Sequence, residues 1–193
     1  MKKILSLLVI LLVGLGLVGC KKVYKIGETG PAGGIIFYDK GTFTDGWRYL
    51  EAAPAQTEFS AKWGGGMQVD GSGRWIANGI GIGTSNHIGA GKQNTQLIVN
   101  RLGAGSYAAA QCNSLNIGNF SDWFLPSKDE LNSMYRNLTA NGFGAFNNDY
   151  YWSSSEIDAS FVRSQNFSDG SHQYGNYRQN KNDANRVRAI RAF

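Results

Sequence analysis

The sequence predicts one α+β domain, with strands near both ends of the chain and helices between them. Short segments rich in aromatic and β-branched residues lie near both ends, whereas apolar residues at helical spacing lie in the middle. Glycine accounts for 26 of the 193 residues and aromatic residues for 12%, a composition that fits a loop-rich folded domain. We therefore expect a few helices around small antiparallel sheets, with the two ends of the domain paired.

The first 19 residues predict a lipoprotein signal peptide. Lys2 and Lys3 precede an apolar run at residues 4–13 that is too short to span a bilayer comfortably. The following LVGC sequence, which ends at Cys20, resembles the bacterial lipobox. This resemblance implies cleavage before Cys20 and attachment of two or more acyl chains, each methylene contributing about 0.8 kcal/mol when buried. We expect a chain anchored by lipid at the outer surface of the bacterial envelope; the alternative is a cleaved, secreted protein with a chance cysteine.

The charge pattern favours a membrane over a nucleic acid as the partner of the basic residues. Cleavage would remove two lysines and lower the formal net charge from +5 to +3. Beyond Lys21-Lys22 there is no run of basic residues, so we expect no nucleic-acid partner. These lysines and Lys25 lie in a predicted tether at residues 20–28, where they can meet anionic lipid head groups. With Cys20 lipidated, Cys112 has no partner for an intrachain disulfide.

The domain is expected to span residues 29–193 and to open with two strands. These strands are predicted at residues 34–39 and 47–53, and the Asp45-Gly46 dipeptide between them predicts a turn. Residues 59–91 are rich in glycine and predict a long loop. A loop of this length inside a compact domain is uncommon unless it has a function.

Three helices are predicted in the middle of the chain. Apolar residues at helical spacing predict the first two at residues 92–102 and 106–115. The third begins after Ser127, because Glu130 three residues later completes a capping box. Asn141-Gly142 is expected to stop it.

The end of the chain predicts further strands. They are expected at residues 150–153, 162–167 and 186–191. In the last of these, Val187 and Ala189 alternate with arginines, which predicts one apolar face and one arginine face. Four aromatic residues are assigned to the core, namely Trp47, Trp123, Trp152 and Phe167.

The segment at residues 157–185 has the composition of a binding surface rather than of a core. It mixes Tyr, Arg, His, Ser, Asn and Gly and has almost no aliphatic residues. Aromatic side chains supply rigid contact area, small polar ones supply adaptable hydrogen bonds, and Tyr and Arg are enriched at interface hot spots. The predicted ligand-binding residues are Asp158, Phe161, Arg163, Ser171, His172, Tyr174, Tyr177 and Arg178. The alternative is a polar loop whose aromatic residues pack back onto the scaffold, with His172 solvated.

The motifs of common enzymes and metal sites are missing from the sequence. There is no His-Glu-x-x-His, Cys-x-x-Cys, EF-hand loop or complete phosphate-binding loop. Cys112 lies in an alanine-rich helix and is interpreted as a buried, inert thiol. Asp129 and Glu130 are explained by the dipole of the third helix rather than as a catalytic pair. We therefore expect no enzyme, no cofactor and no metal.

Five motifs occur in an order that resembles a known family. They are GPAGGIIFYD at residues 30–39, WRYLEAAP at 47–54, DWFLPSKDEL at 122–131, YWSSSE at 151–156 and VRAIRAF at 187–193. Together they resemble the C-terminal domain of collagen-like bacterial adhesins, the Lcl C-terminal family, and the variable proteins of diversity-generating retroelements. The resemblance covers about residues 27–193.

The resemblance implies a C-type lectin fold of the formylglycine-generating-enzyme subgroup, with paired terminal strands and a solvent-facing ligand site in the last segment. In retroelement variable proteins, template adenines are mutagenised, so Asn and Tyr codons change while the scaffold stays fixed. Residues 157–185 lie where that region would fall. The chain departs from the common pattern at residues 161–163, where an Asn-Ala-Trp-like triplet is usual. It also lacks the cysteine pair that the enzymes of this fold use.

Three functions were weighed on this basis. The leading one is a surface-displayed lipoprotein that binds a protein or other macromolecular ligand, as a monomer, through a diversifiable segment. The second is an adhesin of the same fold and of fixed sequence that binds polysaccharide or host matrix. The arginines near the C-terminus, which could bind an acidic polysaccharide, are the reason for this alternative. The third, an envelope enzyme, would depend on Cys112.

Overall fold

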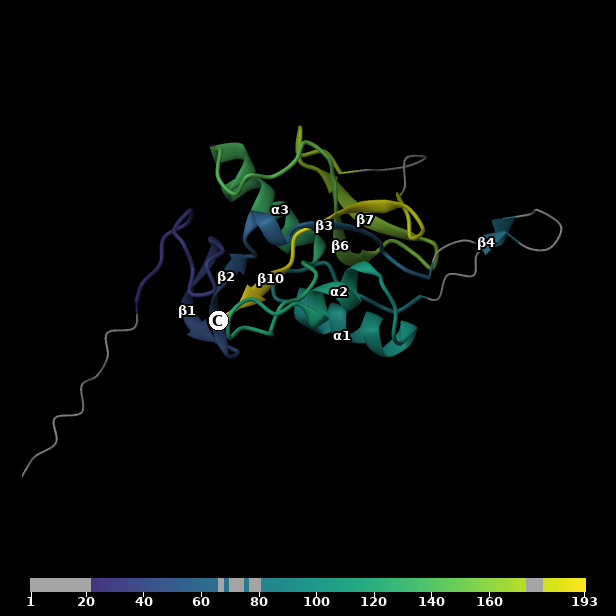
Figure 1. Ribbon diagram of the computed structural model, residues 1–193, viewed down its shortest axis with the longest axis horizontal. Coiled ribbons are helices and arrows are strands. Elements are labelled where there is room, and N and C mark those ends of the chain that lie inside the picture. Colours follow the sequence, from purple (N-terminus) through teal and green to yellow (C-terminus); the bar gives the residue numbers. More distant parts are fainter. Residues whose placement is uncertain (1–21, 66–67, 70–74, 77–80, 173–178) are drawn as a thin grey trace, which may run out of the picture.

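The domain combines three α-helices with small β-sheets in the part of the chain that is described, and the predicted α+β class is confirmed (Figure 1). The structure is a computed structural model that describes residues 22–65, 68–69, 75–76, 81–172 and 179–193. The predicted signal peptide and Cys20 lie outside these ranges. Within them, no helix has both the length and the apolar character needed to cross a membrane.

The first sheet joins the two ends of the domain. It contains, in spatial order, β1 (Ile35–Thr44), β2 (Trp47–Ala52) and β10 (Ile190–Ala192), all antiparallel. The hairpin turns at Asp45 and Gly46, whose φ angles of 53° and 83° suit an Asp-Gly turn. The carbonyl oxygen of Phe193 accepts hydrogen bonds from the N–H groups of Arg48 and Tyr49 at 2.8 and 2.9 Å. The predicted pairing of the ends is therefore confirmed, with β2 as the direct partner of the last strand.

The second sheet carries the segment that was predicted to bind ligand. Its spatial order is β3 (Phe59–Lys62), β9 (Ala184–Val187), β6 (Tyr150–Glu156), β7 (Phe161–Asn166) and β8 (Gln179–Asn180). The pairing of β9 with β6 is parallel, and the other pairings are antiparallel. β6 and β7 confirm two predicted strands, and each extends one to three residues beyond one end of its predicted range.

The single strand predicted at residues 186–191 is wrong, because the chain changes sheets there. β9 ends at Val187 and β10 begins at Ile190, so the two lie in different sheets. Arg188, between them, is only 2% exposed. Its guanidinium pairs with Glu58 at 2.6 Å and donates to the Ala53 carbonyl oxygen at 3.2 Å. The arginines of this region therefore do not form the predicted polar face, since Arg188 and Arg191 are buried.

The long loop predicted at residues 59–91 is interrupted by strands. β3 occupies its first four residues, and β4 (Gln68–Val69) and β5 (Trp75–Ile76) form a short hairpin. β3 is too short to give a periodic signal, and its partner β9 lies more than a hundred residues away in the chain. Trp63 follows β3 and is fully buried, with its indole N–H donating to the Ser153 carbonyl oxygen at 2.8 Å.

All three predicted helices are present, although the third ends at Asn137, before the predicted stop, and is followed by a 3-10 turn at Thr139–Asn141. The helices are α1 (Gly91–Leu102), α2 (Ala108–Ser114) and α3 (Lys128–Asn137). The capping box of α3 is confirmed: Ser127 Oγ accepts from the N–H of Glu130, and the Glu130 carboxylate accepts from the N–H of Ser127. The chain leaves this region through Gly142, which has a left-handed φ of 75°.

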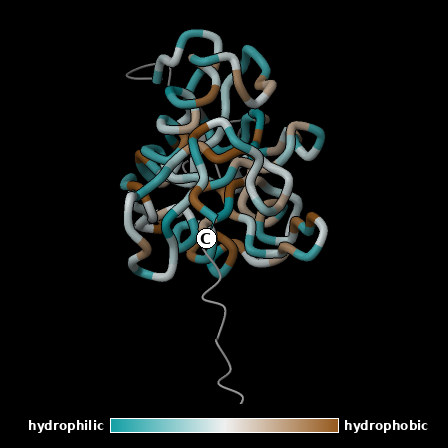
Figure 2. The backbone as a smooth tube through the Cα atoms, turned by 90° about the vertical axis from the view of Figure 1, so that its left-hand side faces the viewer, coloured by the Kyte–Doolittle hydropathy of each residue, from teal (hydrophilic) through white to brown (hydrophobic). Residues whose placement is uncertain are grey.

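Two buried clusters hold the layers together. One surrounds Trp63, Trp123 and Trp152 beside α1 and α2, and the other surrounds Tyr151 and Phe167 beside α3. The core assignments of Trp123, Trp152 and Phe167 are confirmed. Trp47 is only partly buried and packs at the edge of the second cluster. Hydrophilic stretches form much of the outer surface of the chain, and several hydrophobic ones run through its interior (Figure 2).

Candidate ligand-binding surface

The predicted binding segment forms an edge of the second sheet. It begins at the turn between β6 and β7, continues through β7 and the loop after it, and returns through β8 (Figure 1). Tyr174, Tyr177 and Arg178 belong to the prediction but lie outside the described residues. The other five predicted residues are described, and the structure separates them into two groups.

The first group lies at the β6–β7 turn. The side chain of Asp158 is exposed, and its carboxylate accepts hydrogen bonds from the N–H groups of Ser160 and Phe161 at 2.8 and 3.0 Å. Asp158 therefore shapes the turn, a role that Asp commonly has. Phe161 begins β7 and is partly exposed. Its neighbour in the strand, Val162, is 1% exposed and belongs to the core.

The second group gathers Arg163, Ser171 and His172 beside the N-terminus of α3. Arg163 is partly exposed, whereas the next residue, Ser164, is 3% exposed. His172 forms a bridge with Gln165 of β7, which brings the loop back onto the strand. Because burial and the positive charges of Lys128 and Arg163 outweigh a hydrogen bond with the Ser164 backbone, the pKa of His172 is lowered. The imidazole is half-buried rather than fully solvated, and its lowered pKa keeps it neutral near pH 7.

The loop between β7 and His172 is held by specific contacts. Gln165 is fully buried, and its amide N–H groups donate to Asn132 Oδ1 and to the Gly170 carbonyl oxygen, both at 3.0 Å. Gly170 has a left-handed φ of 77°, and a Cβ atom there would overlap the ring of Tyr135. The loop thus presents Ser171 from a fixed backbone.

A buried ion pair joins Lys181, near the end of the segment, to Glu156, which directly precedes the segment. Lys181 Nζ lies 2.6 Å from Glu156 Oε1, and the two side chains are 1% and 7% exposed. The other carboxylate oxygen of Glu156 accepts from the N–H groups of Ile82 and Gly83 at 2.8 and 3.0 Å. The ammonium group also lies 4.6 Å from the centre of the Trp63 ring. Sequence reasoning missed this pair, because a lone lysine in an Asn-rich stretch gives no sign of burial.

Unsatisfied polar atoms concentrate on β7. In the described part of the chain, four buried side-chain polar atoms have no hydrogen-bond partner within the protein, and three of them are consecutive: Arg163 Nε, Ser164 Oγ and Gln165 Oε1. Buried polar groups are nearly always hydrogen-bonded, so such a concentration calls for a specific explanation. These three residues of β7 lie next to Ser171 and His172, two of the predicted ligand-binding residues.

Cys112 is fully buried, and burial raises the pKa of its thiol. Among the described residues, no group of three or more His, Cys, Asp or Glu side chains is arranged to hold a metal ion. Two open hollows lie on the surface, and neither is lined by residues of the predicted binding segment that are described.

Comparisons with known proteins identify the family of the chain. A search among curated proteins finds no significant match. The model of the Lcl C-terminal domain matches residues 75–191, which is more than half of the chain and extends from β5 to β10. The chain therefore belongs to the Lcl C-terminal domain family.

Proposed function

We propose that this chain is a lipid-anchored protein of the bacterial surface that binds a macromolecular ligand through residues 157–185. The proposal includes a C-type lectin fold for the domain and lipidation at Cys20. Membership of the Lcl C-terminal family supports a ligand-binding role, and the pairing of both chain ends in one sheet is the arrangement expected for that fold.

The observation that carries the proposal is the contrast between the two faces of β7. Phe161 and Arg163 are partly exposed, while Val162 and Ser164 between them are buried. Over residues 161–164 the strand is therefore packed on one side and displayed on the other, as the alternation of side chains in a strand allows. The displayed part ends at Gln165, which is buried. A surface of this kind can change its exposed side chains without losing its packing.

The same contrast supports a division between fixed and diversifiable positions. Seven described residues of the segment are buried and are expected to stay constant, namely Ser160, Val162, Ser164, Gln165, Phe167, Lys181 and Asn185. Among the residues of the segment that are at least partly exposed, we assign ligand specificity to four predicted ones, namely Phe161, Arg163, Ser171 and His172. If a diversity-generating retroelement acts on this gene, substitutions should fall on the second set and spare the first.

Resequencing the gene and its flanks in many clones of one strain tests the diversification. The proposal predicts substitutions at adenine positions in codons 157–185, beside a near-copy repeat and a reverse-transcriptase gene. An invariant gene without a repeat would favour the alternative, an adhesin of fixed sequence.

A binding experiment tests the site itself. Variants that differ only at Phe161, Arg163, Ser171 and His172 are displayed on cells and screened against a panel of host and bacterial surface proteins. Variants altered at exposed positions elsewhere, such as Leu97 on α1, serve as controls. Ligand choice should change with the first set and not with the second; the same choice in both sets would contradict the proposed site.

The structure weakens the argument for a polysaccharide-binding adhesin, which was based on the arginines near the C-terminus. Arg188 and Arg191 are buried and paired, with Glu58 and with Glu51 and Asp122 respectively. They cannot present a basic surface to an acidic polysaccharide. Arg163, which is partly exposed, remains available on the candidate surface.

A further inference from the structure

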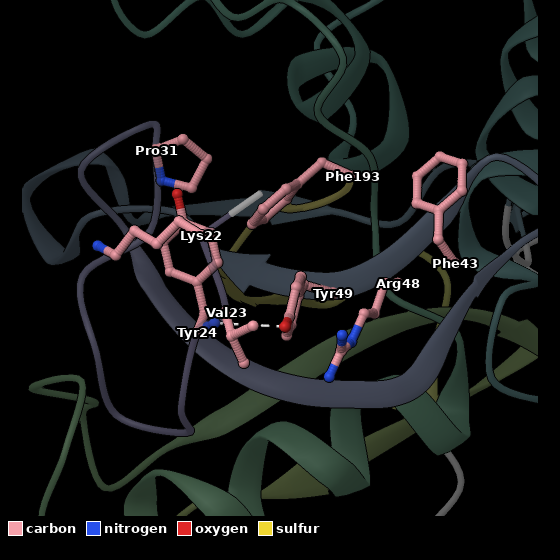
Figure 3. Close-up of a pocket in the computed structure, with 8 residues that line it drawn as sticks. All are labelled: Lys22, Val23, Tyr24, Pro31, Phe43, Arg48, Tyr49 and Phe193. Carbon is pink, nitrogen blue, oxygen red and sulfur yellow. Dashed lines mark hydrogen bonds between the residues drawn. The ribbon is translucent and has the colours of Figure 1, made fainter. Parts of the chain in front are cut away.

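An open hollow of about 360 Å³ lies where the chain enters the domain (Figure 3). Of the four aromatic residues that line it, three form a cluster, namely Tyr24, Tyr49 and Phe193. They come from the segment before β1, from β2 and from the C-terminal residue, so the hollow lies against the first sheet. It is therefore part of the end of the molecule where the first and last strands of the domain share a sheet.

The aromatic rings form a fixed floor. The ring of Tyr24 meets those of Tyr49 and Phe193 edge-on, with centroids 5.4 and 5.5 Å apart, and the Tyr49 and Phe193 centroids are 5.6 Å apart. The Tyr24 N–H also donates to the Tyr49 hydroxyl oxygen at 3.3 Å. Edge-to-face contacts of this kind stabilise an aromatic cluster. The segment before β1 is thus attached to the sheet rather than hanging from it.

The rim of the hollow is apolar and exposed. Val23 and Phe43 both line it, with 64% and 57% of their surfaces exposed. They are the two most exposed large hydrophobic residues in the described part of the chain. An apolar patch beside an aromatic floor is typical of a surface that contacts a partner or a membrane. Tyrosine in particular is enriched where an apolar phase meets water.

Lys22 gives the rim a positive charge, whereas two other basic side chains close to it are paired with carboxylates. Arg48 is neutralised by Asp39 at 2.7 Å, and Lys40 lies 3.5 Å from Asp45. Lys22, whose ammonium group lies 4.4 Å from the centre of the Tyr24 ring, adds a positive charge at the edge.

The position of the hollow along the chain indicates which partner this is. Lys22 lines the hollow and is only two residues after Cys20. Two extended residues span about 7 Å at most. A lipid on Cys20 therefore keeps the hollow within a few ångströms of the bilayer surface.

We propose that this hollow and its rim rest on the membrane, with Val23 and Phe43 in the interfacial layer and Lys22 among anionic head groups. The inference depends on the proposed lipid anchor at Cys20. It adds an orientation to that anchor, because the first sheet and β7 lie on different sides of the molecule in Figure 1. The surface around β7 would then face away from the membrane.

Site-directed labelling of the full-length, lipidated protein tests this orientation. Cysteine is introduced by Phe43→Cys, by Val23→Cys, or by Leu97→Cys as a control on α1 that is 36% exposed. Cys112 is fully buried and Cys20 would be acylated, so the new thiol is the one that a polar fluorescent reagent reaches. Each labelled protein is placed in vesicles of phosphatidylcholine and phosphatidylglycerol. Quenching by lipid-attached and by water-soluble quenchers is then measured.

The inference predicts that lipid-attached quenchers act several-fold more strongly at positions 43 and 23 than at position 97, and water-soluble quenchers less strongly. The difference should shrink in vesicles of phosphatidylcholine alone. Equal exposure to water at all three positions, in protein that stays with the vesicles, would overturn the orientation while leaving the anchor intact. Protein that leaves the vesicles, with label found on Cys20, would overturn the anchor and the orientation together.

Discussion

Glu130 joins the N-terminal ends of two helices through a single buried carboxylate. It accepts hydrogen bonds from the N–H groups of Ser127 at 2.6 Å and Gly89 at 2.8 Å, and it is fully buried. Gly91, the first residue of α1, is a glycine because a Cβ atom there would overlap this carboxylate. The residue therefore fixes α1 against α3, beyond its role in the capping box.

Burial gives Glu130 a measurable effect on the pH dependence of stability. Although several backbone hydrogen bonds oppose it, burial raises the pKa of Glu130 from 4.5 to about 7. Between pH 4.5 and 7 the folded protein holds this proton while the unfolded chain has released it. Glu130 therefore makes its full contribution to the free energy of unfolding below pH 4.5, and this contribution is lost as the pH rises towards 7. We expect urea unfolding to show this loss in the wild-type protein, and Glu130→Gln to remove it.

The comparison for this experiment is Asp129→Asn, which changes a half-exposed carboxyl of the same helix. It should keep the pH dependence of the wild-type protein. If Glu130→Gln retained the full dependence between pH 4.5 and 7, the raised pKa would be wrong.

The buried ion pair between Lys181 and Glu156 is a second contact whose effect on stability can be measured. We expect Lys181→Met to lower the free energy of unfolding by about 3–5 kcal/mol, because it leaves the Glu156 carboxylate buried without its counter-charge. The double variant with Glu156→Gln should recover part of this loss. Lys62→Met, at an exposed position of β3, is the control and should change stability by about 0.5 kcal/mol or less. Urea titration measures all three, and equal stabilities for Lys181→Met and Lys62→Met would contradict the buried pair.

Residues of this kind mark the limit of what the sequence can predict. The capping box could be recognised because Ser127 and Glu130 are three residues apart. The pairs of Arg188 with Glu58 and of Arg191 with Glu51 join residues 130 and 140 positions apart. No local pattern relates such partners. An arginine in an alternating strand was therefore assigned to a polar face.

At the scale of elements, the crossing from β9 to β10 is the step that links the two sheets. Arg188 holds it with two nitrogen atoms on Glu58, at 2.6 and 3.1 Å, and a third that donates to the carbonyl oxygens of Ala53 and Gly144 at 3.2 and 3.1 Å. A lysine cannot reproduce this planar set of donors. Arg188→Lys should therefore lower the free energy of unfolding by about 2–3 kcal/mol, measured by urea titration.

Arg186→Lys provides the matched control for the crossing. Arg186 is 36% exposed at its side chain and contacts Glu58 and Asp149 at the longer distances of 3.8 and 3.4 Å. Glu58 is buried, but Arg186 is partly exposed and its distances are long, so we expect these pairs to contribute about 1 kcal/mol or less. Similar losses for the two substitutions would show that the guanidinium of Arg188 does not hold the crossing.

Elements with local signals were predicted well and those without them were not. Apolar spacing and a cap defined α1 and α3, and the Asp45-Gly46 turn defined the first hairpin. β3 has four residues and exists through its pairing with β9. The boundary between β9 and β10 depends on the burial of Arg188. Both errors arise from tertiary contacts that override a short local pattern.

For the candidate site, the structure shows how the predicted residues are arranged. Arg163, Ser171 and His172 do lie together, but Asp158 is engaged in its own turn. The composition of residues 157–185, which lacks the apolar period of a core, is the reason for proposing this segment as the binding surface. Composition could not separate a displayed side chain from one that shapes a turn.

At the scale of the whole molecule, the domain places its first and last strands in one sheet and displays part of β7 from another. Lipid anchoring beside the first sheet and ligand binding beside β7 would then use different surfaces. Substitutions on one surface should leave the other unchanged. The two proposals can therefore be tested independently in the same protein.

The displayed face of β7 should tolerate changes that its buried face does not. We expect joint replacement of Phe161, Arg163, Ser171 and His172 by alanine to abolish ligand binding, because it removes the polar and aromatic contact area. Each site should change the free energy of unfolding by about 1 kcal/mol or less, since none is fully buried. Val162→Ala, on the buried face, should instead lower stability by about 2 kcal/mol and leave ligand choice unaltered at temperatures where the protein is folded. Thermal unfolding and binding measured on the same samples separate these effects. Binding that survives the fourfold variant would place the ligand on another surface of the domain.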